Sequence, residues 1–148
     1  MYENGLNLPE YKDGKSVLSA QTLYEKLRRL GFDHNSSVGI MGNMMAESGF
    51  DVNARHPKGL YHGLAQNSTD IRNAIIKQYG NYGVDSQLRY ISDWADKAKW
   101  ITRNGYTTTN AGRFLKRGYK TPEEAARKFV ELYERAVVRD KNGNIIKG

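Results

Sequence analysis

The hydrophobic positions of this chain recur mostly at the spacing of three and four residues that places them on one face of a helix. Leu23, Leu27 and Leu30 form such a stripe in a segment from about 19 to 30, which Gly31 ends. Similar stripes, most of them preceded by a capping residue, predict further helices. These cover residues 33–48, 68–79, 85–100, 111–117 and 121–136. About six helices and little strand pattern indicate a mainly α architecture.

Residues 39–50, GIMGNMMAESGF, form the most apolar stretch. Asp33 is a suitable N-cap for the helix that contains it, and Gly49 is suited to the left-handed residue that ends a helix. Within a helix, Gly39 and Gly42 are each less favourable than alanine by about 1 kcal/mol. We therefore expect another backbone to pack closely against the face that they share.

Glu47 is the only acidic residue in that stretch. Because its sequence neighbours are apolar or small, we expect it in the last turn of a buried helix that ends at a cleft. A desolvated carboxyl keeps its proton to higher pH, which is what a general acid near neutral pH requires. The alternative is a helix-end acid turned toward solvent, as most glutamates are.

Residues 49–68 show no clear periodicity, and loops of this length are usually functional. Pro57 to Gly59 resembles a turn between two short extended pieces, so the segment is either a long cleft-lining loop or a small hairpin. Tyr61 among amides and histidines is typical of a sugar-binding wall, because rings stack on sugars while amides bind hydroxyl groups. Tyr61 is equally consistent with a core position.

Composition excludes several classes of protein. The 148 residues suffice for one domain without a disulfide or metal, and the chain has no cysteine and three histidines without helical zinc spacing, so we expect neither a metal nor a cofactor. No apolar run approaches the roughly 20 residues of a membrane span. The N-terminus lacks the pattern of a signal peptide.

The net charge of +7 favours an anionic partner, such as nucleic acid, a wall rich in teichoic acid or a membrane surface. Basic residues are spread through every segment instead of clustering on one helix, so we expect no specific nucleic-acid partner. Residues 1–15 are predicted to be a flexible arm, 16–140 the folded domain and 141–148 a polar tail. Residues 102–110 suggest a polar loop.

Four blocks along the chain resemble one family. They are GIMGNMMAESGFDVNA at 39–54, YHGLAQ at 61–66, QLRYI at 87–91 and FVELYER at 129–135. In this order, across about residues 20–138, they resemble the phage tail lysozymes. The resemblance implies a lysozyme-like fold, a location in the virion tail and action on the bacterial wall. The implied partners are peptidoglycan glycan strands and other tail proteins.

The same resemblance implies roles for individual residues. Glu47 matches the catalytic acid, while His62, Gly63 and Gln66 match a block that lines the cleft. Tyr133 matches a residue that faces the same cleft, with Glu134 beside it. Two positions depart from the family pattern. Asn67 stands where members often have Trp, so the ring that would stack on a sugar at that subsite is absent and Tyr61 could replace it. Ala136 stands where members often have Pro.

The resemblance implies cleavage of the β-1,4 bond between N-acetylmuramic acid and N-acetylglucosamine, with Glu47 as general acid. Asp51 and Asp70 are candidates for a second carboxylate, although both also suit turns or helix starts. A retaining pair is separated by about 5 to 5.5 Å and an inverting pair by about 6.5 to 9.5 Å. Without a second carboxylate, Glu47 would act as acid and then base in a lytic transglycosylase. A non-catalytic wall-binding or structural tail module is the remaining interpretation.

Overall fold

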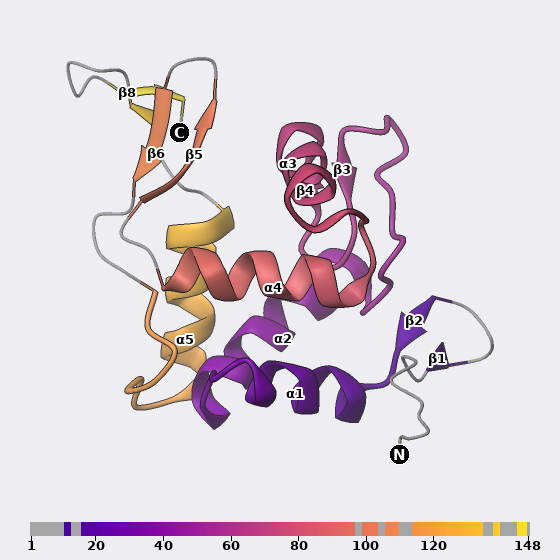
Figure 1. Ribbon diagram of the computed structural model, residues 1–148. Coiled ribbons are helices and arrows are strands. Elements are labelled where there is room, and N and C mark those ends of the chain that lie inside the picture. The colour runs from indigo at the N-terminus through magenta and orange to yellow at the C-terminus, as the bar shows by residue number, and fades with distance from the viewer. Residues whose placement is uncertain are drawn as a thin grey trace.

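The computed structural model describes residues 11–12, 16–96, 99–103, 106–109, 114–134, 138–139 and 145–147. Its helices are α1 (Ala20–Arg29), α2 (His34–Ser48), α3 (Thr69–Tyr79), α4 (Val84–Ala95), α5 (Pro122–Phe129) and the π-helix η1 (Val130–Glu134). In Figure 1, α1 and α4 lie one above the other, α3 lies above α4, and α5 stands upright at the left. The mainly helical, lysozyme-like architecture expected from the sequence is confirmed. None of the described helices is long and apolar enough to cross a membrane.

Three small antiparallel sheets accompany the helices. Their strands are β1 (Tyr11–Lys12) with β2 (Val17–Leu18), β3 (Tyr61–His62) with β4 (Asn67–Ser68), and β5 (Lys99–Arg103), β6 (Tyr106–Thr109), β7 (Val138–Arg139) and β8 (Ile145–Lys147) in that order. A small hairpin lies within 49–68 as expected, but it is the β3–β4 pair, whose turn is at residues 63–66 instead of at Pro57 to Gly59. The expected turn at Pro57 to Gly59 is also present, because Arg55 and His62 form an antiparallel bridge across it.

The ends of the chain differ in part from the sequence interpretation. Residues 102–110 were expected to be a loop, but β6 pairs with both β5 and β7. Its run of threonines explains the difference, since β-branched residues favour extended backbone. Tyr11–Lys12 of the expected arm pair with β2, and Ile145–Lys147 of the expected tail pair with β7. The rest of the arm, residues 1–10 and 13–15, and positions 135–137, 140–144 and 148 lie outside the described residues.

Helix α2 begins and ends at the residues that the sequence indicated. The backbone N–H of Ser36 donates to Asp33 Oδ1 at 2.9 Å, and Gly49 closes the helix with φ of 61°. Helix α5 likewise begins after Thr121, whose hydroxyl oxygen accepts from the N–H of Glu124 at 3.1 Å. Local capping chemistry therefore determines where the two central helices start.

Two other helix expectations are wrong. Helix α4 starts after Gly83 instead of Asp85 and ends at Ala95 instead of near Trp100. The described part of the short helix expected at 111–117 is not helical. Its backbone bonds instead to the start of α2, where Ser36 Oγ donates to the carbonyl of Leu115 at 2.8 Å. These tertiary contacts replace the hydrogen bonds that a helix would have made within the segment.

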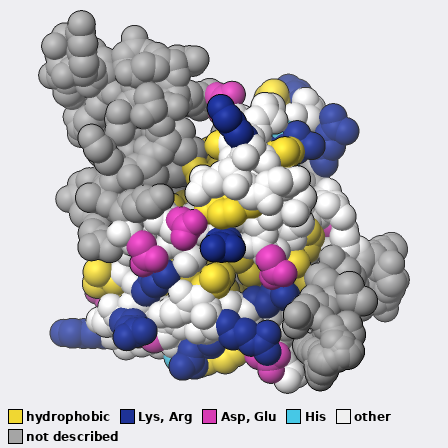
Figure 2. All heavy atoms as spheres, in the orientation of Figure 1, with side chains coloured by type: hydrophobic (Ala, Val, Ile, Leu, Met, Phe, Trp, Pro, Cys, Tyr) yellow, Lys and Arg dark blue, Asp and Glu magenta, His cyan; other side chains and the backbone are white. Residues whose placement is uncertain are grey.

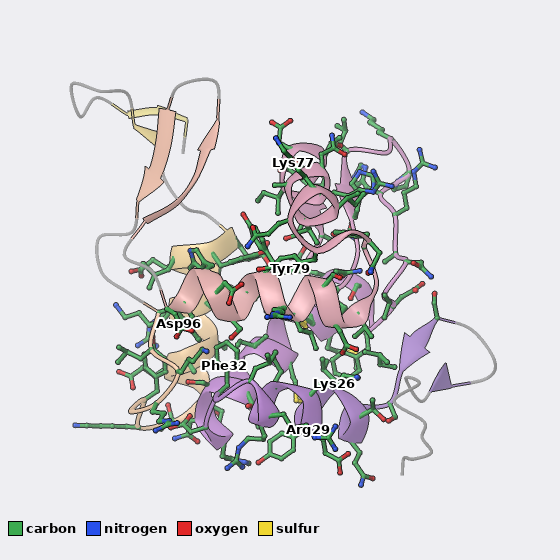
Figure 3. The ribbon with its side chains drawn as sticks, viewed as in Figure 1. Lys26, Arg29, Phe32, Lys77, Tyr79 and Asp96 are labelled. Atoms are coloured by element: carbon green, nitrogen blue, oxygen red, sulfur yellow. The ribbon has the colours of Figure 1, made fainter. Side chains whose placement is uncertain are left out.

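Contacts at both faces of α4 join it to α1 and α3. Lys26 of α1 forms an ion pair with Asp85 at 2.8 Å, and Tyr79 of α3 donates a hydrogen bond to Asp93 (Figure 3). Beneath these polar contacts lies an aromatic core centred on Trp94. The Trp94 ring stacks on Phe114 at a centroid distance of 5.9 Å and meets the edge of Tyr133 at 4.8 Å.

Helix α2 packs against α5 at Gly39. A Cβ placed on Gly39 would lie 2.6 Å from Ala125 Cβ and 2.6 Å from the backbone nitrogen of Ala126. The expected close approach is therefore confirmed at Gly39. It is wrong for Gly42, where a Cβ would meet nothing within 4 Å, because that residue is exposed on another side of the helix.

This contact predicts opposite effects of one substitution at two neighbouring glycines. Gly39→Ala should lower the free energy of unfolding by about 1 to 3 kcal/mol, because the new methyl group must push α5 away. Gly42→Ala should raise it by up to about 1 kcal/mol, since alanine favours the helix and the site is open. Urea unfolding followed by circular dichroism measures both values. Equal effects at the two positions would contradict the packing described here.

Candidate active site

Glu47 lies in the last turn of α2, two residues before its left-handed cap. Its side chain is exposed, as are those of Met45 and Ala46, so the expectation of a buried helix end is wrong. The core covers α2 only as far as Met44, and the last turn extends beyond that cover. Glu47 is therefore accessible from solvent.

A second carboxyl, that of Glu134, lies close enough to Glu47 to be affected by its charge. Glu134 ends the π-helix η1, and its Oε1 is buried without a hydrogen-bond partner among the described residues. Burial and, secondarily, the charge of Glu47 raise the pKa of Glu134 to about 8. The group that meets the sequence-based requirement of a desolvated carboxyl is thus Glu134, which is protonated at neutral pH.

Helix geometry explains why the two carboxyls meet. Gly39, Asn43 and Glu47 are spaced by four residues, so they share one face of α2. Gly39 contacts α5 at Ala125 near its start, and Glu47 is coupled to Glu134 at the end of η1. The two helices therefore run side by side in the same direction, and both bring an acid to the same end.

Asn43 adds an amide to this face, one turn before Glu47. It is 7% exposed, and its Oδ1 lacks a hydrogen-bond partner within the described part of the chain. An unsatisfied buried acceptor costs about 1 to 3 kcal/mol. Two such oxygens, Asn43 Oδ1 and Glu134 Oε1, on neighbouring helices are characteristic of a site that a ligand or water completes.

Neither aspartate expected as a second carboxylate is found in a comparable setting. Asp51 Oδ1 accepts hydrogen bonds from Ser16 Oγ and, at 2.9 Å, from the N–H of Asn53. Asp51 therefore fastens the start of the loop to the segment before β2, as a turn residue does. Asp70 is exposed in the first turn of α3, where a negative charge favours the helix dipole.

A chain of hydrogen bonds joins η1 to the β3–β4 hairpin. The Tyr133 hydroxyl donates to Asn67 Oδ1 at 2.7 Å, Asn67 Nδ2 donates to Tyr82 Oη at 3.0 Å, and Tyr82 donates to the carbonyl of His62 at 2.7 Å. Tyr133 and Asn67 are only 5% and 3% exposed. Tyr133 therefore holds the hairpin in place instead of presenting its ring to a cleft, and Asn67 is a buried link rather than a stacking surface.

Gly63 and Gln66 shape the same hairpin. Both have positive φ, 80° and 51°, and a Cβ on Gly63 would lie 2.4 Å from the buried Oε1 of Gln87. The side-chain amide of Gln66 donates to the carbonyls of Ala54 and Gly63. Tyr61 differs, since it is 45% exposed and forms a T-shaped contact with the His56 ring, so part of its ring is open to a ligand.

A cavity of about 570 Å³ lies beside the hairpin. Its lining consists of Asn53, Ala54, Arg55, His62, Gly63, Arg72, Tyr82 and Gly83. Burial and then the charges of Arg72 and Arg55 lower the pKa of His62, whose Nε2 lies 3.1 Å from Thr69 Oγ1. His62 is therefore neutral at neutral pH. Among the described side chains, no three histidine or acidic groups are arranged to hold a metal ion.

The sequence pointed to part of this arrangement. The helix-ending Glu47 and the FVELYER block with Glu134 were both visible as motifs. The pairing of Arg55 with Arg72 had no sequence signal, because the two residues come from a loop and a helix without a shared spacing.

Comparison with known proteins adds one finding. The family model described as phage tail lysozyme matches residues 19–147. The matched region includes Glu47, Glu134 and every residue that lines the cavity. No curated protein matches the chain.

The raised pKa of Glu134 predicts a pH-dependent stability. The folded state keeps this proton up to about pH 8, whereas an unfolded chain releases it near 4.5, so the free energy of unfolding should fall as pH rises between these values. Glu134→Gln mimics the protonated acid and should flatten the dependence. Each pKa unit corresponds to about 1.36 kcal/mol, so we expect the variant to gain at least about 1 kcal/mol over the wild type near pH 8.

Denaturant unfolding across this pH range measures the effect. Glu131→Gln is the matched control, because Glu131 lies in the same π-helix but is exposed. Parallel pH profiles of the wild type and Glu134→Gln would show that Glu134 is ionised at neutral pH.

Proposed function

Because the chain belongs to the phage tail lysozyme family, we propose that it cleaves the β-1,4 bond between N-acetylmuramic acid and N-acetylglucosamine. Membership itself gives the coarser function, a lysozyme-like protein of phage tails that degrades peptidoglycan. The observation that carries the finer proposal is the pair of carboxyls, Glu47 and Glu134, at adjoining helix ends. In this role the protein opens the bacterial wall locally for the tail, alongside other tail proteins.

In this proposal Glu47 is the general acid. Its carboxyl is exposed, so a glycosidic oxygen can approach it, whereas Oε1 of Glu134 is buried. A bound glycan strand excludes water from Glu47, and desolvation favours the protonated form of a carboxyl. The neighbouring Glu134 is itself protonated at neutral pH and adds no negative charge beside Glu47. The proton that Glu47 holds is therefore the one that it transfers.

Transfer of that proton to the glycosidic oxygen lets the leaving sugar depart through an oxocarbenium-like transition state. The exposed ring of Tyr61 provides a surface on which a sugar can stack.

The state of the second carboxyl favours one alternative, a lytic transglycosylase. A covalent retaining route needs an ionised carboxylate about 5 to 5.5 Å from the acid. Glu134 is protonated at neutral pH, and Asp51 is engaged by Ser16 and Asn53. Glu47 would then act first as acid and afterwards as base. As a base it activates either a water molecule, which gives a reducing sugar, or a hydroxyl of the substrate itself, which gives an internal anhydro sugar.

Glu47→Gln tests the assignment, since it removes the transferable proton and keeps the shape of the side chain. We expect the rate of peptidoglycan cleavage to fall by roughly 100-fold or more, the usual contribution of a general acid. Mass spectrometry of digested peptidoglycan identifies the bond cleaved and separates reducing from anhydro products. Glu25→Gln, an exposed acid of α1, is the control. An unchanged rate in Glu47→Gln would remove Glu47 from the mechanism and leave a wall-binding module.

A further inference from the structure

Two arginines face one cavity without an acidic partner. Arg55 comes from the loop before β3 and Arg72 from α3, and both line the cavity of about 570 Å³. The lining contains no aspartate or glutamate. Within the described residues, no ion pair joins either arginine to a carboxylate. Two like charges held together in this way favour an anion from outside the chain.

Arg72 is held in position by the hydrogen-bonded hairpin. Its guanidinium lies over the Tyr82 ring at 5.7 Å from the centroid. That ring is itself fixed, because Tyr82 Oη accepts from Asn67 and donates to the carbonyl of His62. Arg72 Nη1 also donates to Asn73 Oδ1 at 3.4 Å, and the remaining N–H groups of this positioned guanidinium are left to bind a ligand.

Arg55 is placed by the neighbouring turn. Its backbone bridges to His62, and a Cβ at Gly59 would lie only 2.9 Å from Arg55 Nη2, so the side chain packs across that turn. The neutral His62 ring lines the same cavity without adding a charge, and its Nε2 lies 3.1 Å from Thr69 Oγ1. Asn53 and Tyr82 contribute further uncharged polar groups to the lining.

We propose that this cavity binds the terminal carboxylate of a peptide that is attached to the glycan strand. The inference rests on the proposed function, which identifies the bound polymer as peptidoglycan. The two guanidinium groups that line the cavity match a carboxylate in charge, and each carries the planar set of N–H donors that a carboxylate accepts. The volume exceeds what a single ion needs and lies within the roughly 300 to 1,000 Å³ of small-molecule sites, so it accommodates the end of a peptide together with its carboxylate.

The cavity is connected to the carboxyl pair through the hairpin. His62 pairs with Asn67 across β3–β4. Asn67 Oδ1 in turn accepts a hydrogen bond from the hydroxyl of Tyr133, the residue before Glu134. A peptide anchored at the arginines would therefore hold its strand against the hairpin wall while Glu47 acts. Such anchoring affects substrate binding more than the chemical step, so its loss should appear mainly in KM.

The test compares Arg55→Gln, Arg72→Gln and Arg72→Lys with the wild type. For peptide-bearing peptidoglycan we expect KM to rise about tenfold in each Gln variant with kcat nearly unchanged, as for loss of a charge-assisted hydrogen bond. Arg72→Lys should recover only part of the loss, because lysine keeps the charge but not the fork. Arg29→Gln is the control, since Arg29 is exposed on α1 and points away from α4 (Figure 3).

Measurements on two further peptidoglycan preparations decide whether the bound anion is a peptide carboxylate or a phosphate. On glycan strands stripped of peptides by an amidase, the wild type and the Gln variants should have equal KM. A defect that persists on stripped strands would overturn the proposal. A defect that disappears when teichoic acid is removed and the peptides are kept would also overturn it, because the anion would then be a phosphate.

A binding experiment separates this proposal from the proposed catalysis. The His62 ring resonances are followed by NMR during titration of Glu47→Gln with an N-acetylmuramoyl peptide that ends in a carboxylate or in an amide. We expect the carboxylate form to shift them with roughly tenfold higher affinity, and this difference to vanish in Arg72→Gln. Equal binding of the two peptides would overturn the proposal. If the wild type cleaves no glycan, the proposed function fails, and this titration still tests the cavity.

Discussion

The close contact of α2 with α5 at Gly39 is the constraint on which the site depends. Only a residue without a side chain allows the α2 backbone to approach Ala125 and Ala126 so closely. With this point fixed, the four-residue repeat of the helix carries Asn43 and Glu47 along the same face. The end of α2 therefore meets the end of η1, and two acids from distant parts of the sequence share one environment.

Within that environment the two acids differ in how far they are buried. Glu47 is exposed beyond the last core residue of α2, whereas Glu134 at the end of the π-helix η1 is half-buried, with its Oε1 fully covered. Burial and the neighbouring charge keep a proton on Glu134 at neutral pH. An accessible carboxyl beside a protonated one is a suitable arrangement for acid catalysis, since the accessible group meets the substrate and the neutral neighbour adds no second negative charge beside it.

The β3–β4 hairpin links this pair to the arginine-lined cavity. The bond from Tyr133 to Asn67 is buried and those onward to Tyr82 and His62 are partly buried, so they fix the hairpin more firmly than solvent-exposed bonds would. Asn67 thus has a structural role, because it links Tyr133 to Tyr82. Basic side chains are otherwise distributed over the visible surface, along the lower edge over α1 and at the upper right near α3 and β3 (Figure 2). The overall positive charge therefore suits an anionic wall in general, while the cavity concentrates two charges at one point.

The sequence by itself determined most of the helices, the caps at Asp33 and Thr121 and the family, because periodicity, capping and motifs are formed by residues near one another in the chain. It indicated a close approach equally at Gly39 and Gly42, and only the packing of α5 distinguishes the two. Only the tertiary structure decided which acid is buried, since desolvation depends on what covers a side chain. For the same reason it turned residues 114–117 away from a helix. It also brought Arg55 and Arg72 to one cavity, because that juxtaposition requires the hairpin to fold back on α3.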